Sequence, residues 1–168
     1  MTLIVIGGAT ATGKSSLALD VAERIGAEIV NADSMQLYRG MDIGTAKLPT
    51  EQRRGITHHL LDVLDVTEDA SVAGYQQEAR GIIDALLKKG TPVVVVGGTG
   101  LYIKALIDEL NFPDRNPEVR ARLMEESERV GSKVMHQRLQ QLDPESAALI
   151  PEQNVRRVIR ALEVIELT

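Results

Sequence analysis

A glycine-rich octapeptide near the N-terminus constrains the fold of this chain more than any other feature. Residues 8–15 read Gly-Ala-Thr-Ala-Thr-Gly-Lys-Ser and match the pattern G-x-x-x-x-G-K-[ST] at every specified position. An apolar, β-branched run at residues 3–6 precedes the octapeptide, and apolar residues at helical spacing follow it from Leu17 to Ile25. A strand, a glycine-rich turn and a helix in this order form a loop whose backbone N–H groups surround phosphate oxygens. The sequence therefore predicts a polyphosphate-binding loop in a parallel α/β protein.

The residue types in this loop predict individual roles. The backbone N–H groups and the dipole of the following helix would hold the phosphates, while Lys14 would contact the terminal phosphates and Ser15 would ligate Mg²⁺. A loop that only turns the chain is the alternative, and the complete motif in this context disfavours it. The predicted diphosphate-binding residues are Gly8, Ala9, Thr10, Ala11, Thr12, Gly13, Lys14 and Ser15.

Predicted strands and helices alternate along the first two-thirds of the chain. This alternation indicates a doubly wound parallel sheet of the P-loop nucleoside-triphosphate-hydrolase type, in which the loops after the strands share one edge. The expected strands cover residues 3–6, 28–30, 59–63 and 92–96, and the expected helices cover 17–25, 72–89 and 101–110.

The composition changes near Asn111, where a turn-rich stretch begins. Beyond it the chain is highly charged, and helices are expected at residues 118–130, 133–142 and 155–167. We therefore expect a P-loop α/β core, a helical insertion-like segment and a helix that returns to the core, at residues 1–111, 112–150 and 151–168.

Composition excludes several classes of function. The 168 residues include no cysteine, which rules out disulfides, thiolate zinc sites and cysteine nucleophiles. The net charge of -5 lacks the basic excess of proteins that bind nucleic acids indiscriminately, although it leaves room for a local basic groove. The apolar run at residues 3–6 is too short for a signal peptide or a membrane span, so we expect a cytoplasmic protein without membrane contact.

Asp33 follows the second expected strand and should face the same crevice as the phosphate loop. A carboxylate in that position can accept a proton from an attacking nucleophile. The sequence from Asp33 to Gln36 also fits a capping box, with Asp33 at the N-cap of a helix. The spacing alone does not decide between the base and the cap.

The segment Gly-Gly-Thr-Gly at residues 97–100 follows the valine-rich strand. Its glycines permit close backbone approach, and Thr99 can donate its hydroxyl to a phosphate or a leaving oxygen, or cap the next helix. No acidic residue ends this strand, which weakens an ATPase or GTPase interpretation and weakens a kinase interpretation less.

Arg156, Arg157 and Arg160 share one side of the last expected helix, apart from its apolar side. Arginines grouped in this way suit a pyrophosphate or an RNA backbone. A solvated charged face is the alternative.

Six sequence segments occur in a characteristic order. They are the phosphate loop, Asp-Ser-Met-Gln at 33–36, Tyr-Arg-Gly-Met-Asp-Ile-Gly-Thr-Ala-Lys at 38–47, His-His-Leu at 58–60, Gly-Gly-Thr-Gly-Leu-Tyr at 97–102, and Arg-Val-Ile-Arg-Ala-Leu-Glu at 157–163. Together they resemble the tRNA dimethylallyltransferases, a family of isopentenyltransferases found in bacteria and eukaryotic organelles. The chain departs from the family at Ala9, where a proline is usual. Family members also continue beyond the equivalent of Thr168, so we expect their C-terminal region to be absent from this sequence.

The resemblance implies an activity. The family transfers a dimethylallyl group from dimethylallyl diphosphate to the N6 amino group of adenosine-37, next to the anticodon of tRNA, and releases diphosphate. Such a leaving group needs charge neutralisation, and an exocyclic amine needs a base, in agreement with the residue types above. The target base would leave its stack to enter the crevice.

The resemblance also implies roles for single residues. Asp33 matches the general base, Thr99 the residue that assists the departing oxygen, and Arg160 an arginine on the diphosphate side; with Lys14 these are the predicted catalytic residues. Mg²⁺ would bind near Ser15. The implied tRNA-binding residues are Asp33, Ser34, Met35, Gln36, Thr99, Arg120, Arg156, Arg157 and Arg160.

The expected partners are dimethylallyl diphosphate and the tRNA anticodon stem-loop, bound by a monomer without an obligate protein partner. One rival is an adenylate dimethylallyltransferase that uses free AMP, ADP or ATP. Another is a small-molecule P-loop kinase, in which Asp33 would deprotonate a substrate hydroxyl. A domain that binds diphosphate or RNA without turnover is the third.

Overall fold

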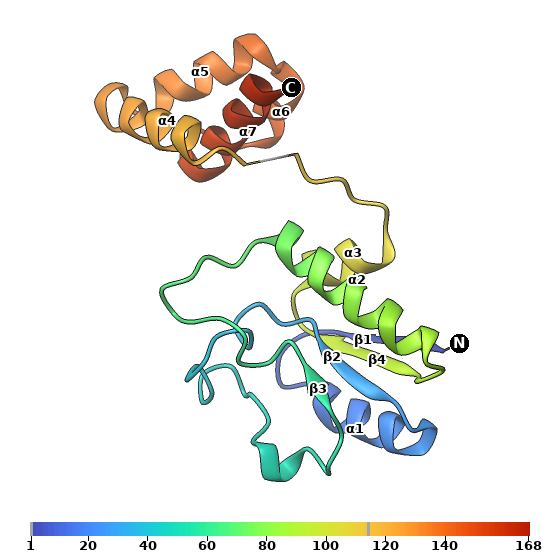
Figure 1. Ribbon diagram of the computed structural model, residues 1–168. Helices are drawn as coiled ribbons and strands as arrows, with labels where there is room; N and C mark the ends of the chain where they lie inside the picture. The colour runs from blue at the N-terminus through green and yellow to red at the C-terminus, as the bar shows by residue number, and fades with distance from the viewer. Residues whose placement is uncertain (1, 114) are drawn as a thin grey trace. The chain divides into compact units, whose positions relative to one another are not determined.

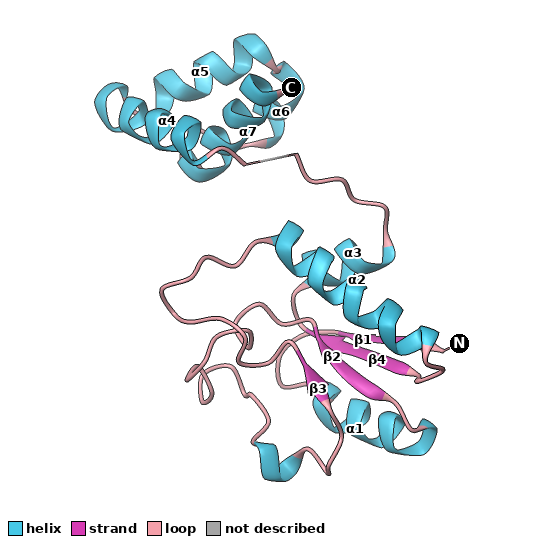
Figure 2. Ribbon diagram, in the orientation of Figure 1, coloured by secondary structure: helices cyan, strands magenta, loops and turns pink. Residues whose placement is uncertain are grey.

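The computed structural model describes residues 2–113 and 115–168. Contacts within the chain group into two compact units, Met1–Leu110 and Asn111–Thr168. The first unit contains a sheet with helices, and the described part of the second contains only helices as regular elements (Figure 2). The change of composition near Asn111 therefore coincides with a structural boundary.

Four parallel strands form the sheet of the first unit (Figure 1). In spatial order they are β1 (Leu3–Gly7), β4 (Val93–Gly97), β2 (Glu28–Asn31) and β3 (His58–His59). Val5 of β1 and Val30 of β2 both lie in register with Val95 of β4. The run of valines in β4 fits this central position, because a parallel strand covered on both faces favours β-branched residues throughout.

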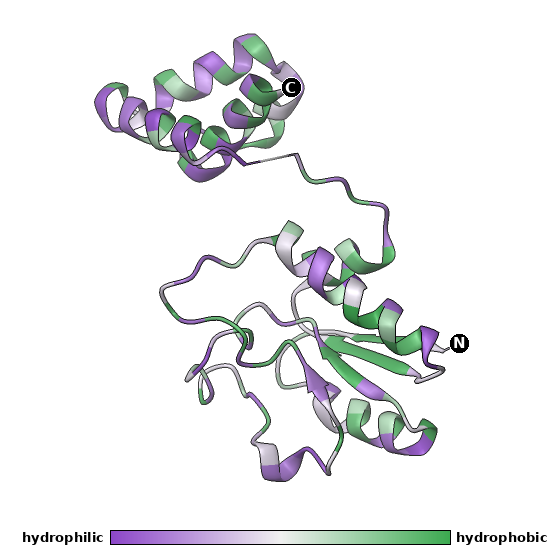
Figure 3. Ribbon diagram, in the orientation of Figure 1, coloured by the Kyte–Doolittle hydropathy of each residue, from purple (hydrophilic) through white to green (hydrophobic). Residues whose placement is uncertain are grey.

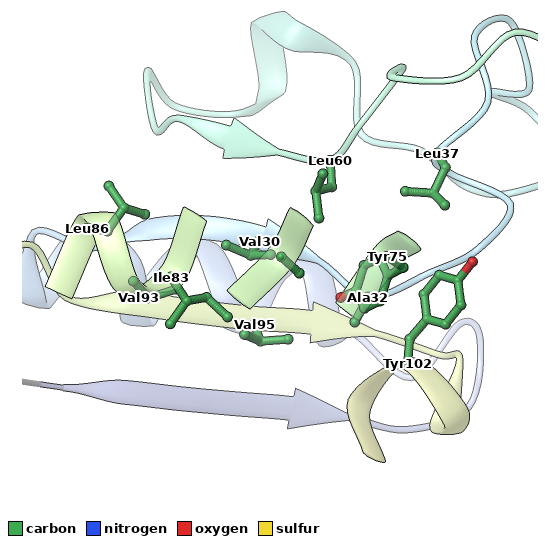
Figure 4. Close-up of a cluster of buried hydrophobic side chains, with 11 residues drawn as sticks. Val30, Ala32, Leu37, Leu60, Tyr75, Ile83, Leu86, Val93, Val95 and Tyr102 are labelled. Carbon is green, nitrogen blue, oxygen red and sulfur yellow. The ribbon is translucent and has the colours of Figure 1, made fainter. Parts of the chain in front are cut away.

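Helices cover both faces of the sheet, which confirms the predicted doubly wound α/β fold. α1 (Lys14–Ile25) packs on one face, and α2 (Val72–Lys88) and α3 (Gly100–Ile107) pack on the other. Successive side chains of a strand point to opposite faces, so Val93 and Val95 join the α2 cluster while Val94 joins the α1 cluster. Figure 4 shows Ile83 of α2 beside Val93 and Val95, and Figure 3 shows the apolar character of the central strands.

The third strand is shorter than the sequence predicts. Residues 59–63 are apolar enough for a strand, yet β3 contains only His58–His59. Leu60 and Asp62 adopt positive φ angles of 59° and 57°, which a pleated strand cannot accommodate. Val63 N and Leu64 N both donate to the carbonyl of Leu37, so the segment pairs with a loop instead.

Four helices form the second unit around one apolar cluster. They are α4 (Pro117–Val130), α5 (Ser132–Leu142), α6 (Pro144–Leu149) and α7 (Val155–Leu167). No helix was expected at α6, a short helix in which Asp143 caps the N-terminus by accepting from Ser146 N at 2.9 Å. The buried core residues are Leu123, Met135, Leu139, Ala147, Val158, Ile159 and Leu162.

The expected three-part division becomes a two-part division in the structure. Val158, Ile159 and Leu162 of α7 pack in the same cluster as Leu123 of α4. The helix expected at the end of the chain thus belongs to one compact unit with the charged segment before it.

Candidate functional site

The phosphate loop leads directly from β1 into α1. β1 ends at Gly7, and α1 begins at Lys14, three residues before the first apolar residue of the helical pattern. Ala11 and Gly13 have positive φ angles of 65° and 82°. Gly13 stands at the N-cap and has no side chain to satisfy the first N–H groups of α1, which leaves them for an anionic ligand.

The side chains of the loop converge on the carbonyl of Ala9. Thr12 Oγ1 donates to Ala9 O at 2.8 Å, and the ammonium group of Lys14 also donates to Ala9 O. Thr12 is exposed and Lys14 is half-buried, so a phosphate bound in the loop can compete for the ammonium group. The loop is therefore held in a closed turn with its cation on the inner side.

A cavity of about 140 Å³ brings the phosphate loop together with the loops after β2 and β4. Parallel strands place these loops at one sheet edge, as the fold predicts. The cavity is lined by Thr10, Ala11, Thr12, Gly13, Lys14, Ser15, Ser16, Asn31, Asp33, Gln36, Thr45, Ala46, Val96, Gly97 and Gly98.

The backbone around Asp33 is fixed by a complete set of hydrogen bonds. Each N–H group from residue 32 to residue 35 has a protein acceptor, so this loop needs no water to satisfy its donors. The bonds are Ala32 N to Val96 O at 2.7 Å, Asp33 N to Asn31 Oδ1 at 3.0 Å, Ser34 N to Thr99 Oγ1 at 2.9 Å and Met35 N to Asp33 Oδ1 at 3.0 Å.

Two glycines bring the carboxylate of Asp33 close to the end of β4. A Cβ atom on Gly97 would lie 2.1 Å from both the carbonyl carbon and the oxygen of Ala32. A Cβ atom on Gly98 would lie 3.5 Å from Asp33 Oδ2 and 3.5 Å from Gly8 O. The position of Gly98 thus marks where Asp33 and the phosphate loop approach each other.

The structure contains neither the capping box expected at Asp33 nor a side-chain cap from Thr99. Residues 34–37 form turns rather than a helix, and Asp33 Oδ1 accepts from Met35 N within this turn. Gln36 Nε2 donates to Thr45 O at 2.9 Å instead of returning to Asp33 N, so the capping box is absent. Thr99 occupies the N-cap position of α3, but its hydroxyl makes no cap bond and contacts Ser34.

Lys47 closes the loop that forms the outer wall of the cavity. Only 3% of its side chain is exposed, and its ammonium group bonds to Tyr38 O at 2.6 Å, Asp62 Oδ1 at 2.6 Å and Asp42 Oδ1 at 2.9 Å. Burial alone would lower the pKa of Lys47, but the two carboxylates outweigh it and raise the pKa above its usual value. The contact fixes residues 41–46 against the sheet unit.

The four arginines predicted to bind tRNA lie in the second unit. Arg156 and Arg157 are exposed on α7, and Arg157 and Arg160 line an open hollow of about 340 Å³. Arg156 does not line this hollow. The residues of the expected site are therefore divided between the two units, with the arginines grouped on the helical one.

Glu163 connects two of these arginines. It is completely buried, pairs with Arg160 at 3.0 Å and with Arg120 at 3.6 Å, and accepts from Asn116 N at 3.0 Å. Burial by itself raises the pKa of Glu163, but the Asn116 N–H and the two arginines reverse the effect, so the pKa is lowered. Arg160 also donates to Pro113 O at 2.8 Å.

Four residues that support the candidate residues of either unit were not predicted individually from the sequence. Asn31, Lys47 and Glu163 contact residues at least 15 positions away in the chain, and the main-chain oxygen of Thr45 accepts from Gln36. The resemblance did include the segments around Thr45, Lys47 and Glu163, which was the only signal for them. Asn31 lies outside those segments.

The described residues contain no cluster of three or more histidine or acidic side chains that could hold a metal ion alone. The cavity offers the Ser15 hydroxyl and the Asp33 carboxylate, which are the hard oxygen donors that Mg²⁺ prefers. These residues fit a cation shared with a bound polyphosphate. Among the described helices, none has the length and apolar character needed to cross a bilayer.

A glycine-rich loop at the carboxyl edge of a parallel sheet, with a carboxylate lining the same cavity, defines a protein of the P-loop class. A family model described as IPP transferase matches residues 36–168. The chain therefore belongs to the IPP transferase family, in agreement with the resemblance found in the sequence.

Curated relatives and solved structures agree with this family. The tRNA dimethylallyltransferase of Clavibacter sepedonicus is 54% identical over 99% of this chain and 56% of its own length. The tRNA dimethylallyltransferase of Frankia casuarinae is 58% identical over 96% of this chain and 55% of its own length. The chain thus spans about half the length of these relatives.

Two solved structures resemble the chain along nearly its whole length. The full-length tRNA isopentenylpyrophosphate transferase from Bacillus halodurans is 42% identical with a TM-score of 0.64, covering 99% of this chain and 56% of its own. A eukaryotic dimethylallyltransferase acting on tRNA is 29% identical with a TM-score of 0.83, covering 98% of this chain and 41% of its own.

Proposed function

We propose that this chain carries the catalytic part of an enzyme that transfers a dimethylallyl group from dimethylallyl diphosphate to tRNA. The acceptor is the N6 amino group of adenosine-37, next to the anticodon, and diphosphate is released. Membership of the IPP transferase family supports the reaction class, and the likeness to a dimethylallyltransferase acting on tRNA supports the acceptor.

One observation carries this proposal: Lys14, Ser15 and Asp33 line the same cavity. The first two suit an anionic leaving group, and the third suits a base for an incoming nucleophile. A transferase that displaces diphosphate needs both functions a few ångströms apart, on either side of the reacting carbon.

The reaction balances with these groups. The lone pair of N6 attacks C1 of the dimethylallyl group, a C–N bond forms, and the C1–O bond breaks with its electron pair leaving on diphosphate. The N6 proton passes to the Asp33 carboxylate. The N–H groups of the phosphate loop and the Lys14 ammonium stabilise the charge on the departing diphosphate.

Thr99 is proposed to assist the departing oxygen. Its hydroxyl accepts from Ser34 N at 2.9 Å and donates to Ser34 Oγ at 3.3 Å. The long second contact is weak, so the hydroxyl hydrogen can be redirected to a phosphate oxygen.

A Mg²⁺ ion would be held by Ser15 together with the diphosphate, and it would neutralise charge on the leaving group. The tRNA would be bound by Ser34, Met35 and Gln36 beside the base, and by the arginines of the helical unit, Arg120, Arg156, Arg157 and Arg160. With tRNA as the acceptor, we also propose a cytoplasmic protein that acts as a monomer.

The test offers labelled dimethylallyl diphosphate and Mg²⁺ to the protein with one acceptor per reaction: an anticodon stem-loop containing the adenosine, the same stem-loop with inosine in its place, or AMP. We expect label on the adenosine stem-loop alone. Inosine is the control because a carbonyl oxygen replaces the exocyclic amine at C6, so the base offers no N6 nucleophile.

Other outcomes identify the rivals. Label on AMP and none on the stem-loop would establish the adenylate-type reaction instead. Phosphate transfer from ATP to a small molecule, without prenyl transfer, would establish a kinase. Binding of the diphosphate without transfer to any acceptor would leave a binding domain and contradict the proposed activity.

A further inference from the structure

The last residue of β2, Asn31, is a buried polar side chain among apolar neighbours. It is 3% exposed, while Ile29, Val30 and Ala32 around it belong to the apolar clusters on the two faces of the sheet. A buried carboxamide is costly unless its donors and acceptor are satisfied, so its partners show what it holds together.

The carboxamide of Asn31 forms hydrogen bonds with both the N–H group and the carbonyl oxygen of Asp33. Asn31 Oδ1 accepts from Asp33 N at 3.0 Å, and Asn31 Nδ2 donates to Asp33 O at 2.9 Å. Nδ2 also donates to Leu60 O at 2.9 Å. This orientation of the amide is unambiguous, because two carbonyls face the nitrogen and one N–H group faces the oxygen.

These contacts bind one side chain to two loops. Leu60 has a left-handed backbone with φ of 59° and follows the short edge strand β3, so its carbonyl turns toward the end of β2. Both hydrogens of Nδ2 are used in protein bonds, which leaves no amide donor of Asn31 for a substrate. Asn31 also lines the cavity, but because its amide hydrogens are bound to the protein we assign it a positioning role.

We propose that Asn31 is the positioning residue that aims the Asp33 carboxylate at the acceptor amine. This inference rests on the proposed transfer reaction and adds to it a residue that none of the motifs contains. Asp33 Oδ1 is occupied by Met35 N at 3.0 Å, and Oδ2 lies against Gly98. The direction of Oδ2 is then set by the backbone of Asp33, which Asn31 fixes.

The main variant is Asn31→Ala, measured by single-turnover transfer and by the dissociation constant of dimethylallyl diphosphate. We expect the transfer rate to fall about 10- to 100-fold, because a small displacement of a catalytic group is costly. The dissociation constant should change less than about 2-fold, because the phosphate loop is intact.

Tyr75→Phe is the matched control. Tyr75 is 4% exposed, and its hydroxyl donates to the main-chain oxygen of Asn31 at 2.9 Å. The change removes a buried hydrogen bond at the same residue without touching the Asn31 carboxamide. It should lower the melting temperature as a lost buried hydrogen bond does and leave the transfer rate within about 2-fold.

A second comparison separates positioning from general damage. In an Asp33→Ala background, adding Asn31→Ala should lower the residual rate by no more than about 2-fold, because residues that act as one unit are not additive. Hydrogen exchange gives a readout that needs no activity: the amide of Asp33, which bonds to Asn31 Oδ1, should exchange about 10-fold faster in Asn31→Ala.

Each of these measurements can overturn the positioning role of Asn31. Equal losses in the wild-type and Asp33→Ala backgrounds, or a loss of diphosphate affinity as large as the loss of rate, would overturn the positioning role. An unchanged rate in Asn31→Ala would overturn it as well, with the proposed reaction intact. Absence of transfer by the wild-type protein to every acceptor would instead overturn the proposed reaction and, with it, this inference.

Discussion

At the scale of single residues, close backbone approach decides which glycine of the loop after β4 can be replaced. Gly97 lets the end of β4 touch Ala32, where a Cβ would be 2.1 Å from carbonyl atoms that cannot move away. Gly97→Ala should lower the free energy of unfolding by about 2–4 kcal/mol, as measured by denaturant unfolding.

Gly100, three residues after Gly97, provides the matched control for that variant. A Cβ on Gly100 would meet no atom within 4 Å, and Gly100 begins α3. Gly100→Ala should leave the free energy of unfolding unchanged or raise it by up to about 1 kcal/mol. Equal destabilisation by both variants would contradict the close approach.

Glu163 gives the second residue-scale prediction, a dependence of stability on pH. Its pKa in the folded state is lowered from the usual 4.5 by Asn116 N–H and the arginines against the opposing effect of burial. The resulting stabilisation is fully present above pH 4.5 and is lost as the pH falls through the lower folded pKa.

Glu163→Gln should therefore be less stable than the wild type at neutral pH, by about 1–3 kcal/mol, and the difference should shrink in acid. The exposed Glu128 on the same unit serves as the control, and Glu128→Gln should change little at any pH. Thermal unfolding between pH 3 and pH 7 tests this, and a difference that grows in acid would contradict it.

Residue by residue, the sequence predicted which candidate residues lie together better than it predicted the side chains that hold them in place. The phosphate loop and Asp33 were predicted because motif and strand order bring them to one edge, and the structure has them lining one cavity. The side chains that fix them were not predicted, because Asn31 meets Leu60 and Lys47 meets Asp62 only after folding. Asparagine and lysine are usually exposed, so composition gives no signal for a buried one.

At the scale of elements, predictions held where periodicity was strong and failed where the backbone turns. β4 and α7 were found at their predicted places. Four consecutive valines strongly favour a buried strand, and the apolar stripe of α7 strongly favours a helix. The strand expected at residues 59–63 was wrong, because left-handed residues at Leu60 and Asp62 interrupt it and no single-residue propensity reports such turns. The short helix α6 was missed because six residues carry too little periodicity.

The loop closed by Lys47 gives the prediction at this scale. Lys47→Met would remove the ammonium group that pairs with Asp42 and Asp62, leaving Asp62 Oδ2 with the Arg53 guanidinium at 3.9 Å, and would release residues 41–46. We expect a loss of about 2–4 kcal/mol in the free energy of unfolding, with faster hydrogen exchange at the amides of Ala46 and Lys47, which bond to Ile43 O and Asp42 O.

The same substitution at the exposed Lys88 of α2 is the control and should cost less than about 0.5 kcal/mol. Unchanged exchange in this loop of Lys47→Met would show that the buried contact does not hold it.

At the scale of the whole molecule, two separate cores imply two separately perturbable units. Leu123 is completely buried in the helical cluster, and Val95 is completely buried in the sheet cluster. Leu123→Ala should lower the stability of its unit by about 2–5 kcal/mol and speed exchange at amides of α4, α5 and α7. Exchange in β1, β2 and β4 should not change, and a uniform increase across both units would contradict this.

We propose that the cavity lined by Lys14 and Asp33 holds both the diphosphate and the base that accepts the amine proton. The most direct test measures dimethylallyl diphosphate binding and single-turnover transfer to the anticodon stem-loop in Lys14→Ala and Asp33→Asn. We expect Lys14→Ala to weaken binding at least about 10-fold, and Asp33→Asn to bind like the wild type but transfer at least about 100-fold more slowly. Transfer by Asp33→Asn at the wild-type rate, with Lys14→Ala binding normally, would contradict it.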